Sequence, residues 1–135
     1  MFTAYGDAAA IVLDACAKPM SKLCAVIAYY PTQYATTSAG YPPNTEVMVH
    51  AAGSAKVPLK CKAYNYPQAE LGFAESDLEA YDQVSASLAW SRTLGAVRKG
   101  FGINVDLEAI WENHLARKAN FHSSREIKPP YQYAY

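Results

Sequence analysis

A charge-free stretch at residues 23–31, with the sequence LCAVIAYYP, decides the fold class of this chain. Its apolar residues occupy successive positions rather than every second one, so both faces of the predicted strand are apolar. Strands that are covered on both faces are typical of parallel sheets with helices above and below. The stretch therefore predicts the central strand of a parallel sheet.

The residues before this stretch predict the end of a strand, a sharp turn and a helix. The chain opens with MFTAYG, in which we place Ala4 at the tip of the turn. An apolar face recurs with helical spacing from Asp7 to about Lys18, and Pro19 ends it. The carboxylate of Asp7 stands where a side-chain oxygen can cap the first helical amides.

Two further strands are predicted after a loop rich in glycine and proline. They are residues 45–53 (TEVMVHAAG) and residues 59–67 (LKCKAYNYP), and the alternating Lys60 and Lys62 indicate that the second one lies at a sheet edge with one wet face. The connection between them is shorter than the dozen or so residues of a parallel crossover. They are therefore either antiparallel neighbours or joined along the sheet edge without a helix.

Two amphipathic helices follow, over residues 75–99 and 105–119, and residues 122–135 (HSSREIKPPYQYAY) have no period and predict a tail. The interleaving of strands and helices favours the α/β class, with a main domain at 1–103 and an amphipathic helix with a tail at 104–135. The face of the first helix that we expect to be buried consists of Leu78, Tyr81, Val84, Leu88, Leu94, Val97 and Phe101.

Composition excludes several function classes. Apolar residues make up 51% of the 135 residues, and Lys+Arg and Asp+Glu number 12 each, so no excess of positive charge predicts binding to nucleic acid or an anionic membrane. No apolar run reaches the roughly 20 residues of a membrane span, and no basic leader is present. A cytoplasmic location with reduced thiols is expected, and the spacing of the cysteines predicts neither a metal site nor another cofactor.

Four segments, in this order, resemble the dienelactone hydrolase (carboxymethylenebutenolidase-like) family of the α/β-hydrolase fold. The resemblance covers roughly residues 1–100 and implies the C-terminal half of that domain: a partial sheet of about three strands flanked by helices, with an extra C-terminal helix. The segments are AVIAYYP (25–31), VMVHAAG (47–53), AYNYPQAELGFAE (63–75) and AYDQVSASLAWSRTL (80–94).

The resemblance also locates the three positions of the family's catalytic triad, and none carries a reactive side chain. The nucleophile position falls on Ala4, the acid on Ala55 and the histidine on Leu71. Acyl transfer by such a triad needs a nucleophile, a base within reach of it and an acid that orients the base. The family's activity is ester or lactone hydrolysis, and these residues predict that this chain has lost it.

Two alternatives keep a role for the old pocket. The first is a pseudoenzyme in which Tyr30, His50 and Leu71 hold a small apolar, ester-like molecule. The second is a residual hydrolase that acts through His50 or Cys24. Simpler interpretations compete with both, because His50 can be a strand-end histidine with a local hydrogen bond, and Cys24 can be a small core residue.

A third alternative is an interaction module, in which the long helix over residues 75–99 and an exposed strand join another chain. If only the first four residues of the neighbouring strand are present, Ala25–Tyr30 has one flank without a full partner. This segment has no charge, and its proline comes at the end, so it lacks the usual protection of an edge strand. We therefore expect it to pair with a second copy or with a partner chain.

Overall fold

The computed structural model describes residues 1–34, 40–54, 56–103 and 114. The chain divides into two units, Met1–Ile103 and Asn104–Tyr135. Apart from the exposed His114, the helix predicted over 105–119 and the tail predicted over 122–135 lie outside the described residues. Within the described part of the chain, no helix is both long and apolar enough to cross a membrane.

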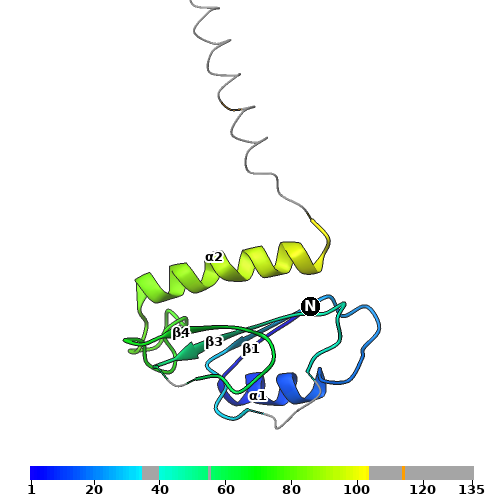
Figure 1. Ribbon diagram of the computed structural model, residues 1–135. Coiled ribbons are helices and arrows are strands. Elements are labelled where there is room, and N and C mark those ends of the chain that lie inside the picture. Colours follow the sequence, from blue (N-terminus) through cyan, green and yellow to red (C-terminus); the bar gives the residue numbers. More distant parts are fainter. Residues whose placement is uncertain (35–39, 55, 104–113, 115–135) are drawn as a thin grey trace, which may run out of the picture. The chain divides into compact units, whose positions relative to one another are not determined.

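The first unit has an α/β architecture with one parallel sheet between two helices (Figure 1). The sheet order is β1-β2-β3-β4, and α1 and α2 cover opposite faces. All five residues of β2 are buried, which confirms the predicted central strand. The elements are β1 (Phe2–Tyr5), α1 (Gly6–Ala15), β2 (Ala25–Tyr29), β3 (Glu46–Ala52), β4 (Lys62–Tyr66) and α2 (Gln83–Gly100).

The pair β3 and β4 is parallel, with Met48 level with Lys62 and Ala52 level with Tyr66. Residues 53–54 and 56–61, which join the two strands, contain no helix. The connection without a helix, one of the two predicted alternatives, is therefore confirmed. The predicted edge position of β4 is confirmed as well, since it ends the sheet.

The prediction that Ala25–Tyr30 has an unpaired flank is wrong. All four residues of β1 pair with β2, from Phe2 opposite Val26 to Tyr5 opposite Tyr29. The short first strand is sufficient because β2 itself has only five residues. The strand at this end of the described sheet is consequently β1.

The α1 face of the sheet has an aliphatic core. Helix α1 begins directly after Tyr5, and no side chain caps it. The predicted cap is therefore wrong: the Asp7 carboxylate accepts a hydrogen bond from the Thr32 hydroxyl instead. The buried residues that pack together on this face include Ala4, Ala9, Leu13, Cys16, Val26, Ala28, Val47, Val49 and Ala51.

Helix α2 differs from its prediction in length and in orientation. It begins at Gln83, where the carboxylate of Asp82 accepts hydrogen bonds from the backbone N–H groups of Val84 and Ser85. The expected apolar face is not the buried one, because α2 turns three small residues inward and leaves five of the seven expected residues exposed. The inward residues are Ala89, Thr93 and Ala96, and the exposed ones are Leu78, Tyr81, Val84, Leu88 and Phe101.

The small residues allow α2 to lie very close to the sheet. A Cβ atom added at Gly100 would be 2.6 Å from the carbonyl oxygen of Cys24 and 2.9 Å from the Cβ atom of Ala25. Bulky side chains on the inward face would force the helix away from these backbone atoms. Close approach therefore decides which face of α2 is buried, ahead of hydrophobicity.

Candidate functional site

The turn between β1 and α1 has its tip at Gly6, which has a φ of +54°. Ala4 lies within β1 opposite Ala28, and it is buried beneath α1. The expectation that Ala4 forms the tip is wrong by two residues. The signal that could have located the tip is the glycine itself, because a left-handed conformation is costly for residues that carry a Cβ atom.

Leu71 lies on the loop that follows β4. It borders an open hollow together with Ala52, Gly53, Ala69 and Glu70, so it lies beside the loop after β3. Its side chain is 61% exposed, whereas Ala4 is buried on the α1 face. The expected apolar pocket shared by Leu71 and Ala4 is absent from the part of the chain that the structure describes. Ala55, the expected acid position, lies outside the described residues.

Four ring side chains form one row across the sheet, beneath α2. Strand register places Tyr5 opposite Tyr29, Tyr29 opposite His50 and His50 opposite Tyr64. The rings of Tyr5 and Tyr29 stack with centroids 4.8 Å apart, and those of Tyr29 and His50 stack at 4.7 Å. The guanidinium of Arg92, from α2, lies 4.1 Å from the centroid of the Tyr64 ring and closes the row at the β4 side.

Hydrogen bonds join this row to α2. The Thr93 hydroxyl lies 2.8 Å from the Tyr29 hydroxyl and 2.9 Å from His50 Nε2. On the other side of the imidazole, His50 Nδ1 lies 2.9 Å from the Tyr66 hydroxyl, to which Arg92 donates at 3.2 Å. Five side chains from three elements of the sheet and from α2 therefore form one continuous chain of hydrogen bonds.

The chemistry of Arg92 gives this chain a direction. A guanidinium only donates, so the Tyr66 oxygen accepts from it. The positive charge makes the Tyr66 hydroxyl a stronger donor, and it disfavours a proton on the nearby His50 Nδ1. We therefore assign the donations from Arg92 through Tyr66, His50 and Thr93 to Tyr29, with the imidazole proton on Nε2.

His50 is neutral and closed to solvent. Its side chain has no exposed surface, and burial, followed by the charge of Arg92, lowers its pKa to about 4. Both ring nitrogens already have partners. A general base must reach the proton that it removes, and this imidazole reaches only hydroxyl groups of its own core. The geometry supports the structural interpretation of His50.

Cys24 lies at the opposite end of the strands from His50. It directly precedes Ala25, which is level with Glu46, the first residue of β3. His50 is four residues beyond Glu46, and Cys24 is one residue before Ala25, so the two residues are five steps apart along the strands. At about 3.3 Å per residue, this separates the two side chains by roughly 16 Å. Cys24 and His50 therefore cannot act together as a nucleophile and its base.

Tyr30 directly follows β2 and has a φ of +36°, which is uncommon for an aromatic residue. Three contacts hold it: its backbone N–H donates to the His50 carbonyl oxygen, its hydroxyl donates to the Glu75 carboxylate, and its ring packs edge-on against Phe73. Burial and the neighbouring Glu75 raise the pKa of its phenol. Tyr30 is thus a fixed part of the core.

The three residues expected to bind a small molecule do not share a cavity. Tyr30 and His50 are buried in contact with other core residues, and Leu71 is exposed at the surface hollow after β4. Across residues 1–34, 40–54, 56–103 and 114, no three side chains of His, Cys, Asp or Glu lie close enough to hold a metal ion. The ring row was missed because its members come from four strands, and the sequence does not display their register.

Comparisons with known proteins add no relative: no family model matches the chain, and no curated protein matches it significantly.

Proposed function

We propose that this chain is a dienelactone hydrolase-like domain without an ester-hydrolysing site, and that it serves as a non-catalytic scaffold. The observation that carries the proposal is the identity of the residue at the turn after β1. In α/β hydrolases the nucleophile stands on such a strand-to-helix turn. Here the turn carries Gly6, which has no side chain to act as a nucleophile.

The surroundings of Gly6 support the same conclusion. A Cβ atom added at this position would meet nothing within 4 Å, so the left-handed φ of +54°, and not a lack of space, is what favours a residue without a side chain here. Leu71 follows β4 beside Gly53, which is compatible with the family's histidine position and provides no base. His50, the candidate base among the described histidines, is buried, and both of its ring nitrogens have hydrogen-bond partners.

The test is multiple-turnover hydrolysis of p-nitrophenyl acetate and of a dienelactone by the purified chain. We expect rates equal to those of heat-denatured protein, because the described residues include no nucleophile at the turn after β1 and no accessible histidine beside it that could form and release an acyl intermediate. Saturable turnover that disappears in His50→Ala or Cys24→Ala would contradict the proposal and favour the residual hydrolase. A Gly6→Cys variant, with its fold checked by circular dichroism because φ at this position is +54°, provides the sharper control. It should be acylated once, without turnover, since the described histidine His50 is buried and both of its nitrogens have partners.

A further inference from the structure

One flank of α2 carries an apolar stripe whose two aromatic ends are exposed, while Val97 between them packs against the core and Leu94 is half-buried. Trp90, Leu94, Val97 and Phe101 follow the spacing i, i+4, i+7 and i+11, which places them on one side of a helix. Trp90 is 59% exposed and Phe101 is 56% exposed. Large aromatic side chains on the surface of a helix mark contact sites when they form a continuous patch.

The strand β1 has an unprotected outer edge. In the sheet of the described residues it is paired on one side, with β2, and its other side faces outward. Its four residues, Phe2–Tyr5, include neither a charged residue nor a proline. Edge strands of monomeric proteins usually carry such residues to prevent pairing with other chains.

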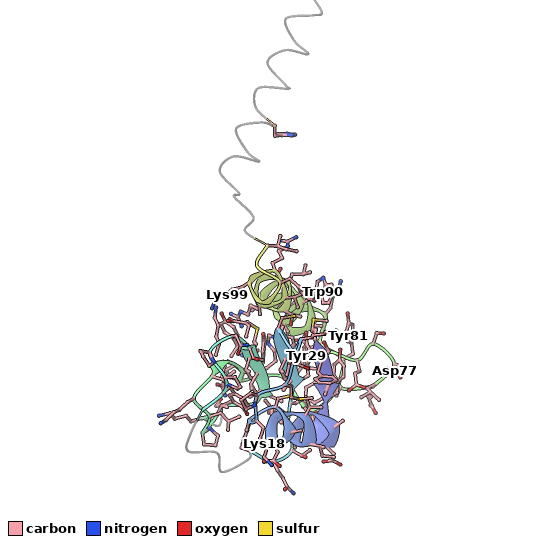
Figure 2. All side chains as sticks on the ribbon, turned by 90° about the vertical axis from the view of Figure 1, so that its right-hand side faces the viewer. Lys18, Tyr29, Asp77, Tyr81, Trp90 and Lys99 are labelled. Carbon is pink, nitrogen blue, oxygen red and sulfur yellow. The ribbon has the colours of Figure 1, made fainter. Side chains whose placement is uncertain are left out.

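The stripe and the open edge lie on the same side of the molecule. Figure 2 shows Trp90, and Tyr81 shortly before α2, on the side of the molecule where β1 lies, and Lys99 on the opposite side. Helical geometry agrees with this placement, because Trp90 and Lys99 are nine residues apart and nine steps of 100° give half a turn more than two turns. Lys99 pairs with Glu46 of β3, further along the sheet.

We propose that this β1 flank binds a second copy of the chain around a two-fold axis. The flank consists of Met1, Phe2, Tyr5, Tyr81, Trp90 and Phe101, each at least 40% exposed. At roughly 100 Å² each, these side chains offer about 600 Å² of surface. The unpaired backbone of β1 adds to this area, which approaches the roughly 800 Å² per partner of a stable interface.

A second copy fits the flank because the flank is complementary to itself. A two-fold axis perpendicular to the sheet places β1 antiparallel to its copy and keeps both α2 helices on one face. The N-terminus of β1 lies below the C-terminal end of α2 (Figure 1). The axis therefore directs Trp90 of one copy toward Phe101 of the other, and no charge of like sign from these residues is brought together.

The test is the mass of the chain by size-exclusion chromatography with light scattering, over a wide range of concentrations. We expect twice the chain mass of 14.8 kDa. Trp90→Glu should raise the dimer dissociation constant about 30-fold or more, as for a central aromatic residue of an interface. The matched control is Leu88→Glu, which is also exposed but lies on the opposite flank of α2 and should leave the constant unchanged.

Hydrogen exchange provides a second readout. Backbone amides of β1 should exchange more slowly as the concentration rises, and Trp90→Glu should abolish this dependence. If Trp90→Glu does not fold, Phe101→Glu at the end of the helix replaces it. A monomer at every concentration, a dimer that Leu88→Glu dissociates and Trp90→Glu does not, or a mass that keeps rising would each overturn the proposal, whatever the outcome of the hydrolysis assay.

Discussion

The two faces of the sheet are built from different chemistry. Beneath α1 the buried side chains are aliphatic, with Leu13 at 0% exposure among valines, alanines and Cys16. Beneath α2 the buried layer contains rings and hydroxyl groups, and its hydrogen bonds pass through His50 and Thr93. One sheet therefore combines an apolar layer with a polar, hydrogen-bonded layer on its opposite faces.

This difference between an aliphatic layer and a hydrogen-bonded layer indicates what each face contributes to stability. Burial of aliphatic surface is proportional to area and does not depend on protonation. A buried hydrogen-bond chain stabilises only while every member has its partner and its proper proton. We therefore expect substitutions under α1 to act at every pH, and the α2 face to respond to acid.

The largest expected effect is from Leu13→Ala, on the α1 face. Leu13 is fully buried, and removal of a buried leucine side chain costs about 3 kcal/mol of unfolding free energy, including the cavity that remains. Urea unfolding monitored by circular dichroism measures the loss. The loss should be the same at neutral and mildly acidic pH, and a strong pH dependence would show that the two faces are not independent.

Acid should weaken the α2 face. The pKa of His50 is about 4 in the folded chain, below the ordinary histidine value of 6.5, so between these two values the unfolded state binds more protons. The stabilising contribution of the neutral His50 imidazole is complete above pH 6.5. As the pH falls toward 4, this contribution is lost and the free energy of unfolding decreases by up to about 3 kcal/mol. Urea unfolding across this range measures the slope.

The control for this titration is His50→Gln, which keeps polar atoms in the core and removes the ionisable group. Carboxylates such as Asp82 also titrate in acid, since hydrogen bonds to Ser85 lower the pKa of that group. The difference between the wild-type and His50→Gln curves isolates the histidine. Parallel curves from pH 6.5 to 4 would contradict the assignment of a neutral, buried imidazole.

The smallest expected effect is from Thr93→Val. This substitution keeps the shape of the side chain and removes the hydroxyl that contacts both Tyr29 and His50. Because Tyr29 and His50 would each lose a buried hydrogen-bond partner, we expect the free energy of unfolding to fall by about 2 kcal/mol in total. Thr45→Val is the matched control, because the buried Thr45 hydroxyl donates to a single carbonyl oxygen, that of Leu23, and its removal should cost less. Equal losses would show that the chain of hydrogen bonds adds nothing beyond single pairs.

The sequence predicted the α/β class and the central strand, and it left the helix-free connection as one of two alternatives, because these features follow from local runs of apolar residues and from loop length. The sequence pattern predicted the wrong buried face for α2. Hydrophobic periodicity favoured Leu88 and Phe101, whereas the close approach of Gly100 to the Cys24 carbonyl favours small residues. Such an approach depends on two segments that are distant in sequence, and no local pattern displays it.

The candidate site also depends on contacts between segments that are distant in sequence. His50 was singled out at the end of its strand, and its hydrogen bonds were expected in general terms. The partners Tyr66, Thr93 and Arg92 come from another strand and from α2. Their positions depend on strand register and on helix rotation, so the structure was needed to show that the imidazole is enclosed.

The row of rings has a consequence for how the strands find their alignment. A parallel sheet has no hairpin turns that fix the pairing of its strands. A slip of one residue in any pair would carry Tyr29, His50 or Tyr64 to the opposite face, into the aliphatic layer that Leu13 and its neighbours already fill. The stacked rings thus fix the strand register, because they favour one pairing among the several that the short strands would otherwise allow.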